Sequence, residues 1–367
     1  MTKNENTALI VFSGYNTRAI FPLLATLSSM NLRFGIISLD DSDLINNTAY
    51  RDKIIFTRNN KNLQIDILIK CIKSYIKDEG LDCAYIAPST EFLNEWLLIN
   101  RDKLLDNKIK APLVGHDLYE SITNKLSFGR LCADNGIKIP KEYSLSEALK
   151  LNMKLVAKPK SNISSGLSMY PIILNRGSHD LDNFLKNHDG NDYFYQEYVS
   201  GDSLYLLYYF SISGTVYSLS QQNFVQEPEG KSMLYSRLSD IHEKPISSKF
   251  IRLFKKVGFK GLVMVELKYF NNLYYMIEAN PRLWGPSQLF VDSGYNIFIP
   301  FLKDIFGDAK ININIKVSDY NAEYSWVGGI NSHKSSELTY YSGFTHEKLA
   351  RMMGELEALD VYSRYML

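Results

Sequence analysis

The first ~115 residues alternate short apolar runs with stretches of helical periodicity, and this alternation constrains the fold more than any other feature. Apolar runs cover Thr7–Ser13, Leu32–Leu39, Lys53–Thr57, Asp82–Pro88 and Ala111–Val114, and helical patterns cover Thr17–Met30, Leu63–Lys77 and Glu91–Leu105. Strands separated by helices predict a parallel sheet with helices on both faces. Gly14 permits a tight turn after the first strand, but the GxGxxG pattern of dinucleotide sites is missing.

The pattern changes after an amphipathic helix that runs from Tyr119 to a stop at Asn135-Gly136. Strands then follow with few helices between them, over Lys154–Lys158, Ser168–Leu174, Tyr193–Val199, Ser203–Ile212, Val216–Ser220, Gly261–Phe270 and Leu273–Glu278. Such a run predicts an antiparallel α+β region. Beyond it we expect strands at Ile311–Val317 and Glu323–Val327 and a helix at His346–Leu359, without chemistry that the residues identify.

Composition excludes several classes of protein. A chain of 367 residues has the length of two or three domains. Lys and Arg total 41 against 40 Asp and Glu, so no basic footprint for nucleic acid is present. Cys71, Cys83 and Cys132 lack CxxC spacing and sit among apolar residues, as thiols of a reducing cytoplasm would. The apolar run Ala8–Phe12 is too short for a signal peptide or a membrane span, so we expect a cytoplasmic protein.

The stretch Gly261–Arg282 carries the most informative pattern. Two strands joined through Asn271-Asn272 predict a hairpin in which alternation gathers Val263, Val265, Leu267, Tyr275, Ile277 and Ala279 on one face. The other face then carries Met264, Glu266, Met276, Glu278 and Asn280. Glu266 and Glu278 oppose each other directly only if the loop has an odd number of residues centred on Asn272.

Two carboxylates that face each other across a ladder repel unless a cation lies between them. Mg²⁺ binds one or two carboxylates together with substrate phosphates, and Asn280 offers a third oxygen on the same face. Arg282 follows, where a developing phosphoryl charge could be met. The alternative is that Glu266 and Glu278 are ordinary solvent-facing residues of an edge hairpin.

Further candidates precede the hairpin in a suggestive order. Lys158 lies in an apolar strand, and the small turn Ser164–Leu167 follows with backbone N–H groups that could close over phosphates. Tyr195–Gly201 leaves another strand at a glycine. Taken singly, each of these segments is also compatible with an ordinary strand end or turn.

Taken together, these residues resemble the ATP-grasp superfamily. The resemblance rests on Lys125 at the start of a helix, Asn135–Pro140, Val156–Pro159, Ser165–Leu167, Gln196–Val199, Glu266 and Glu278–Arg282. The 12-residue spacing of the glutamates and the Glu-x-Asn-Pro-Arg ending are its most specific parts, and they are most similar to the carbamoyl-phosphate-synthase-like branch. It implies a Rossmann-like pre-ATP-grasp domain at 1–118, an ATP-grasp domain at 119–307 with a lid subdomain at about 143–197, and a small C-terminal α/β segment at 308–367.

The resemblance also implies roles for single residues. Lys125 and Lys158 would contact the ATP phosphates, Arg282 would steady the phosphoryl group, and Lys158 and Arg282 would form the catalytic set. Glu266, Glu278 and Asn280 would bind two Mg²⁺ ions, with Mn²⁺ as a substitute. The lid turn would contain Ser165 and Gly166, and Gln196, Glu197, Tyr198 and Val199 would hold adenine largely through backbone groups. Where relatives place a ribose-binding glutamate, this chain has Ser203, with Asp202 beside it.

The function that follows is an ATP-dependent ligase that joins a carboxylate to an amine, such as an amino acid or a small peptide. An acyl phosphate would form with release of ADP, and the amine would displace phosphate. The partners would be these small molecules, and we expect no binding to nucleic acid or to a membrane. The sequence is compatible with a homo-oligomer. Candidate residues for the substrate pocket are Lys231, Arg237, Trp284, Tyr205, Tyr208 and Tyr235, each of which could equally be a packing residue.

Two alternatives stay open. One is an ATP-grasp carboxylase or purine-type enzyme, although the segment Gln221–Val225 lacks the lysine that the carboxylase branch has there, and no biotinyl motif follows. The other is a nucleotide-binding protein without ligase activity. The intact set of Glu266, Glu278, Asn280 and Arg282 argues against it.

Overall fold

The computed structural model describes residues 6–58, 63–160, 163–164, 167–168, 171–176, 178–307, 311 and 314–367. The N-terminal layer is a parallel sheet in the order β3-β2-β1-β4-β5. Its elements are β1 (Thr7–Phe12), β2 (Phe34–Ser38), β3 (Ile54–Thr57), β4 (Cys83–Ile86), β5 (Ile109–Lys110), α1 (Thr17–Ser29), α2 (Ile65–Asp78), α3 (Glu91–Ile99) and α4 (Arg101–Leu105). Leu9 and Val11 join one apolar cluster and Ala8, Ile10 and Phe12 another, so both faces are covered, as the alternation predicts.

Three local expectations in this part were wrong. The last strand lies at Ile109–Lys110 rather than Ala111–Val114, and Pro112 cannot donate to a ladder. The helix expected at Glu91–Leu105 is divided at Asn100, whose side chain donates to the Trp96 carbonyl. Likewise two helices, α5 (His116–Thr123) and α6 (Lys125–Asp134), replace the single one expected from Tyr119.

The large antiparallel sheet has the order β16-β15-β12-β13-β14-β17, with β18 on β13. Its strands are β12 (Asp202–Phe210), β13 (Val216–Gln226), β14 (Met233–Leu238), β15 (Gly261–Phe270), β16 (Leu273–Asn280), β17 (Glu323–Ser325) and β18 (Thr339–Tyr340). Helices α5, α6 and α9 (Pro245–Lys256) pack on one face through residues such as Ile122, Phe128 and Phe254. The sequence predicted an antiparallel region here, although β14 was not expected.

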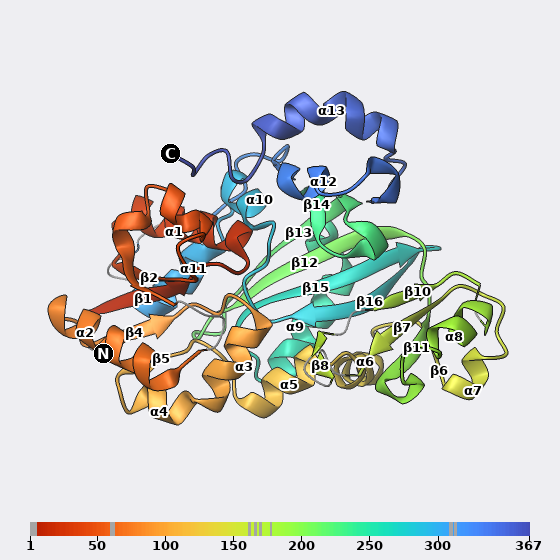
Figure 1. The fold of residues 1–367 in the computed structure, drawn as a ribbon, viewed down its shortest axis with the longest axis horizontal. Coiled ribbons are helices and arrows are strands. Elements are labelled where there is room, and N and C mark those ends of the chain that lie inside the picture. Colours follow the sequence, from red (N-terminus) through yellow and green to blue (C-terminus); the bar gives the residue numbers. More distant parts are fainter. Residues whose placement is uncertain are drawn as a thin grey trace.

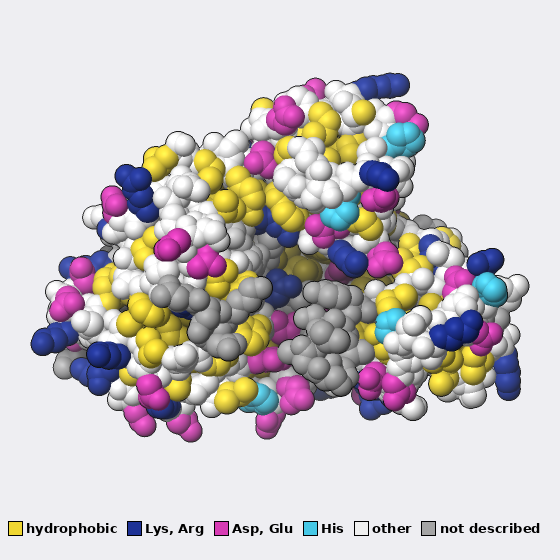
Figure 2. All heavy atoms as spheres, viewed as in Figure 1, with side chains coloured by type: hydrophobic (Ala, Val, Ile, Leu, Met, Phe, Trp, Pro, Cys, Tyr) yellow, Lys and Arg dark blue, Asp and Glu magenta, His cyan; other side chains and the backbone are white. Residues whose placement is uncertain are grey.

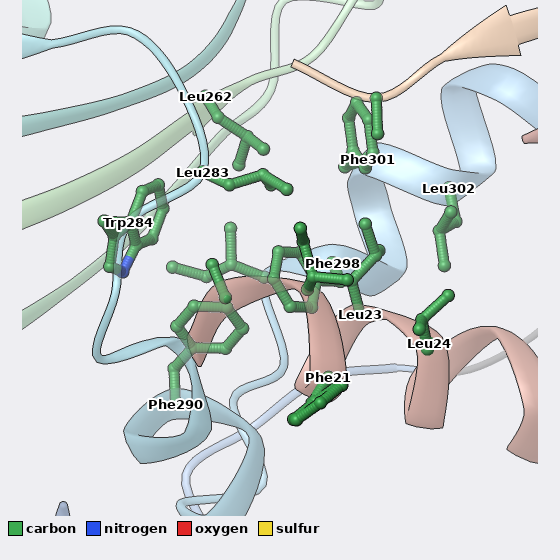
Figure 3. Packing of buried hydrophobic residues seen from close by; sticks show 14 of the residues in the cluster. Phe21, Leu23, Leu24, Leu262, Leu283, Trp284, Phe290, Phe298, Phe301 and Leu302 are labelled. Atoms are coloured by element: carbon green, nitrogen blue, oxygen red, sulfur yellow. The ribbon is translucent and has the colours of Figure 1, made fainter. Parts of the chain in front are cut away.

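The other face of the large sheet shares one core with the N-terminal layer. Phe21, Leu23 and Leu24 of α1 lie against Phe290 of α10 (Ser287–Asp292) and Phe298, Phe301 and Leu302 of α11 (Phe298–Phe306), with Leu262, Leu283 and Trp284 beside them (Figure 3). Burial of this many large apolar side chains in one cluster is the dominant stabilising contribution to this junction. The parallel layer and the large sheet are therefore joined by packing as well as by the chain.

A second, smaller antiparallel sheet lies apart from the first (Figure 1). Its order is β10-β7-β11-β6, and its elements are β6 (Glu142–Tyr143), β7 (Leu155–Pro159), β10 (Ile172–Leu174), β11 (Tyr193–Glu197), α7 (Leu145–Ala148) and α8 (Ser178–Phe184). β8 (Ile163–Ser164) pairs with β9 (Leu167–Ser168). Of the strand expected at Ser168–Leu174, Ser168 lies in β9 and Ile172–Leu174 form β10. The buried apolar residues of this small sheet form a cluster of their own.

The C-terminal segment adds strands to the large sheet and caps one end of it. β17 pairs with β14, β18 pairs with β13, and α12 (Val327–Asn331) and α13 (His346–Ala358) lie above them in Figure 1. Within the described residues 311 and 314–317, the strand expected at Ile311–Val317 does not form. No helix in the described part of the chain is both long and apolar enough to cross a bilayer.

Candidate functional site

The two glutamates of the hairpin face each other as predicted, by a route that the prediction missed. The β15–β16 turn has only two residues, Asn271 and Asn272, both with positive φ (49° and 60°), which suits the twist of a tight hairpin. A regular ladder from this turn would place Glu266 opposite Ile277. Instead Glu266 pairs with Glu278, because a β-bulge leaves Ile277 as an extra residue in β16. The expected loop centred on Asn272 was therefore wrong and the expected pairing is confirmed.

The bulge also changes which side chains share a face. Met276 pairs with Leu267 and lies in the apolar cluster under α5, α6 and α9, not beside Glu266 as alternation suggested. Tyr275 correspondingly pairs with Lys268. The carbonyl of Ile277 accepts a hydrogen bond from Lys158 Nζ at 3.3 Å. The extra residue thus supplies a backbone acceptor to a lysine that comes from the small sheet.

The two facing carboxylates lie in different electrostatic surroundings. Glu266 is 9% exposed, and burial followed by repulsion from Glu278 raises the pKa of its carboxyl. Burial acts in the same direction on Glu278, but Lys125, the Asn280 amide, Lys158 and Arg282 together hold the pKa of Glu278 below its usual value. Lys125 Nζ lies 3.8 Å from Glu278 Oε2, and Asn280 Nδ2 donates to Glu278 Oε1 at 2.8 Å. The negative charge of Glu278 is thus offset by neighbouring protein groups, whereas the negative charge of Glu266 is offset much less.

Lys125 and Lys158 approach this pair from two other elements. Lys125 opens α6, as predicted, and Asn124 caps that helix by accepting from the backbone N–H groups of Leu126 and Ser127. Lys158 lies on β7 and is only 6% exposed. Burial lowers the pKa of Lys158 to about 8, against the opposing attraction of Glu278. Two cations and two carboxylates therefore converge where the small sheet meets the large one.

Arg282 follows the end of β16 and is held by contacts with the residues before and after it. Its Nη2 donates to Asn280 Oδ1 at 3.3 Å and its Nη1 to the Leu283 carbonyl at 3.0 Å. The N-terminal layer holds the neighbouring backbone: Leu283 N–H donates to the Pro88 carbonyl, and Asn16 Nδ2 donates to the Leu283 carbonyl. The guanidinium is thus fixed at the end of the strand that carries Glu278.

The residue set fits Mg²⁺. Glu266 and Glu278 are opposed carboxylates, Glu266 is buried with little compensation, and the Asn280 amide oxygen shares their end of the hairpin. No group of three or more His, Cys, Asp and Glu side chains forms a metal cluster among the described residues, so this site would depend on ligand oxygens from a substrate. That dependence is typical of Mg²⁺ in phosphate chemistry.

The segment expected to hold adenine is less open than the resemblance implies. Gln196 is buried, and its amide donates to Glu142 Oε1 at 3.1 Å. The backbone N–H groups of Glu197 and Tyr198 donate to the carbonyls of Lys141 and Lys154. Any adenine contact from these two residues would therefore use other groups, such as their carbonyls or the neighbouring Val199. Ser165 and Gly166 of the expected lid turn lie outside the described residues.

Asp202 and Ser203 differ in their availability to a ribose. Ser203 is fully buried, and its hydroxyl accepts from Asn223 Nδ2 at 3.0 Å. Asp202 is partly exposed and accepts from the Ser342 hydroxyl at 2.7 Å. Of the two, only the Asp202 carboxylate lies where solvent reaches it.

The expected substrate residues do not converge on one place. Trp284 is buried in the shared core and Tyr208 hydrogen-bonds Ser247 on the opposite face of the sheet. Arg237 pairs with Glu323 at 2.7 Å and donates to the Tyr235 hydroxyl. Lys231 pairs with Glu229 at 3.4 Å, and Tyr205 accepts from Gln226. The fold therefore does not bring these six residues together in one pocket.

Two charged residues near the site were not predicted. Lys268, two positions after Glu266 on the same face, places its ammonium 3.8 Å from the centre of the Tyr341 ring; burial lowers its pKa and Glu266 opposes this. Alternation along β15 could have identified it. Arg18 of α1 donates to the Met233 carbonyl and lies 3.9 Å over the Trp326 ring. A Cβ at Gly285 would lie 3.0 Å from Arg18 Cζ, so any other residue there would require the guanidinium to shift.

Charged side chains gather in a recess of the molecule's surface. Figure 2 shows this recess in the middle of the face, between the N-terminal layer, the C-terminal segment and the small sheet, with basic and acidic groups along it. In Figure 1, β15 and β16 run toward the same region.

Comparisons with known proteins agree with this architecture. Residues 122–286 match the family model described as an ATP-grasp domain. No curated protein sequence matches the chain. Among solved structures, the biotin carboxylase domain of Hydrogenobacter thermophilus 2-oxoglutarate carboxylase, a dimer in complex with MgADP, ADP and bicarbonate, is similar with a TM-score of 0.62 and 13% identity, over 87% of this chain and 72% of that one.

Two further structures show the same likeness. N5-carboxyaminoimidazole ribonucleotide synthetase from Thermotoga maritima has a TM-score of 0.55 at 13% identity, over 86% of this chain and 78% of that one. Rhizobium etli pyruvate carboxylase has a TM-score of 0.60 at 15% identity over 84% of this chain, which spans only 30% of that longer chain. At such identities the likeness concerns the fold. The family match shows that residues 122–286 carry an ATP-grasp domain, and the likeness of fold extends to the parallel α/β layer that precedes it.

Proposed function

We propose that this protein is an ATP-dependent, ADP-forming ligase that joins a small carboxylate to an amine. The observation that carries the proposal is the convergence of Glu266 and Glu278 on one hairpin with Lys125 and Lys158 from two other elements. Two carboxylates and two lysines that lie together, with Glu266 and Lys158 buried, suit the binding of a polyphosphate with its divalent cation.

Each charged group has a role that its position supports. Lys125 and Lys158 would offset the negative charge of the ATP phosphates, and Lys158 is oriented for this by its bond to the Ile277 carbonyl. Glu266, Glu278 and Asn280 would hold Mg²⁺, which would supply positive charge to offset that of the phosphates. Because Glu278 is already compensated by lysine and amide groups while Glu266 is not, Glu266 would gain most from the cation.

The bond-forming steps would take place beside Arg282. The carboxylate of the first substrate would attack the terminal phosphate, giving an acyl phosphate and ADP, and the amine would then displace phosphate. Arg282 would stabilise the charge that develops on the transferred group, since its guanidinium is fixed by Asn280 and the Leu283 carbonyl. The small sheet, acting as a lid over residues 143–197, would exclude water from this intermediate.

A carboxylase is the second candidate, and the similar structures favour it because one of them contains bicarbonate. The residues of β13 argue in the other direction. Gln221 donates to Asn223 at 2.7 Å, and both amides are buried where the carboxylase branch has a lysine. Neutral amides that bond to each other offer no cation for bicarbonate.

The deciding experiment measures ADP release from the full chain with Mg²⁺ and ATP over pairs of carboxylates and amines, in buffer freed of bicarbonate. Hydroxylamine in place of the amine should trap a hydroxamate of the acid that is used, detected by mass spectrometry. ADP release that requires bicarbonate, with no hydroxamate from any acid, would replace the ligase by a carboxylase. ATP binding without turnover under either condition would leave only a nucleotide-binding protein.

A further inference from the structure

A cavity lies at the junction of the parallel sheet and the large antiparallel sheet, at the end of β15 that is far from the hairpin turn. Its volume is about 370 Å³, within the range of small-molecule sites. Apolar and aromatic side chains form most of its wall: Leu104, Ile109, Tyr209, Phe210, Phe301 and Ile305. Gly261 at its edge is five residues before Glu266 on β15, which places the two sites about 17 Å apart along the strand.

The cavity arises because the parallel sheet ends early. β5 has only two residues and is the edge strand of its sheet, and Pro112 prevents the ladder from continuing. The chain at Ala111–Leu113 therefore leaves the sheet and lines the cavity together with the end of β12 and α11. A concave, mainly apolar space of this size at the junction of two layers is the kind of site that small ligands occupy.

Charged groups stand along this apolar space with an excess of positive charge. Of the described residues that line it, Arg101, Lys110 and Lys260 are basic and Asp304 is acidic. Lys260 Nζ donates to the carbonyls of Ser211 and Ile212, at 2.9 and 3.4 Å, and Arg101 Nη2 donates to those of Leu113 and Val114. These carbonyls fix both side chains but carry no net charge, and each cation has more donors than these bonds use. Asp304 already accepts from the Tyr209 hydroxyl and the Ile212 N–H.

Two apolar side chains stand exposed beside this space. Leu105 is 49% exposed and Ile212 is 71% exposed, and both belong to the lining. An apolar interior with fixed cations and an apolar rim suits a molecule that has an apolar body and one anionic group. We propose that this cavity binds a small monocarboxylate with an apolar body, such as a medium-chain acid, with its carboxylate toward Lys260 and Arg101.

The proposal does not depend on the ligase function. The ligand would touch β5 and α4 of the N-terminal layer, β12 and β15 of the large sheet, and α11, so binding would tie these elements together. Ligand binding to the folded state raises the melting temperature by mass action. The bound ligand would lie against the first residue of β15, and the same strand carries Glu266 five residues later.

The test uses octanoate as the probe and octanol as its uncharged match, with the full-length protein in isothermal titration calorimetry and thermal melting. We expect one octanoate per chain, a higher melting temperature with octanoate, and octanol binding at least about tenfold weaker, because the charged hydrogen bonds are lost. Binding of both probes with equal affinity, or with several molecules per chain, would overturn the proposal. So would displacement of octanoate by excess MgADP, which would place the probe in the nucleotide recess.

Variants separate the site from the rest of the surface. Lys260→Met should weaken octanoate binding about tenfold, and Lys255→Met on the exposed side of α9 should leave it unchanged. If Lys260→Met proves unstable, Leu105→Trp at the exposed rim serves instead: it should block octanoate, whereas Leu105→Ala should not. Unchanged affinity in a folded Lys260→Met or Leu105→Trp protein would refute the site.

Discussion

The large sheet and the small sheet bring opposite charges to one site by different means. The large sheet holds Glu266, Glu278 and Asn280 on one hairpin, and its core is continuous with the N-terminal layer. The small sheet brings Lys158, and its buried apolar residues form a separate cluster. An acidic hairpin packed into the main core thus meets a lysine whose sheet has a core of its own. We propose that the small sheet moves as a unit against the hairpin during the reaction, because few buried apolar contacts hold the two together.

The strongest test of the acidic hairpin is to remove one of its charges. Glu278→Gln should fold normally but lose ADP release by about a thousandfold or more, as expected when a ligand of a phosphate-bridging cation is removed. Steady-state ADP release at saturating Mg²⁺ measures this. Glu355→Gln, an exposed carboxylate of α13, is the control. Near-normal turnover in Glu278→Gln would contradict the metal site.

Loss of the lysine from the small sheet should have a smaller effect. Lys158→Met should keep the fold and reduce turnover about a hundredfold, because Lys125 still offsets part of the phosphate charge. Lys154→Met, which removes a lysine stacked on Tyr198 just before β7, should change turnover much less. Equal losses of turnover in the two variants would mean that Lys158 does not contact the ATP phosphates in the way we propose.

The two glutamates should differ in stability when no divalent cation is present. Glu266→Gln removes a buried and poorly compensated charge, so its melting temperature in EDTA should rise, equivalent to about 1 to 3 kcal/mol. Glu278→Gln removes the partner of Lys125 and should give no gain. Thermal melts at pH 8 with and without Mg²⁺ compare the two variants. A higher melting temperature in Glu278→Gln alone would mean that Glu278, not Glu266, carries the poorly compensated charge.

The smallest effect concerns the turn that sets the hairpin. Asn272→Val places a β-branched side chain at φ 60° and should destabilise the protein by about 1 kcal/mol, whereas Asn272→Gly should be neutral or slightly stabilising. Urea denaturation of the two variants gives the difference directly. Equal stability would mean that the turn is not held in this conformation.

Short-range pattern was enough to predict the parallel layer and the opposed glutamates. It could not reveal the bulge, because a two-residue turn with one extra residue in a strand gives the same Glu266 to Glu278 pairing as a three-residue loop. Nor could it reveal Arg18, whose contacts with Met233, Gly285 and Trp326 join segments far apart in the chain.

The substrate residues were the weakest part of the prediction for the same reason. Trp284 and Tyr208 look like a pocket's aromatic residues in sequence, but packing against other layers draws them into cores. Arg237 is occupied by Glu323, a partner 86 positions later that no local pattern indicates.

The bulge at Ile277 has a consequence for how this hairpin tolerates changes in length. The ladder would keep Glu266 opposite Glu278, with both side chains on the same face, if Ile277 were deleted, because the extra residue lies between that pair and the regular pairs near the turn. A codon lost there would leave the carboxylates in place and remove only the carbonyl that receives Lys158. A deletion in this strand would therefore spare the pairing of the two glutamates, whereas the hydrogen bond from Lys158 depends on one residue that the pairing does not need.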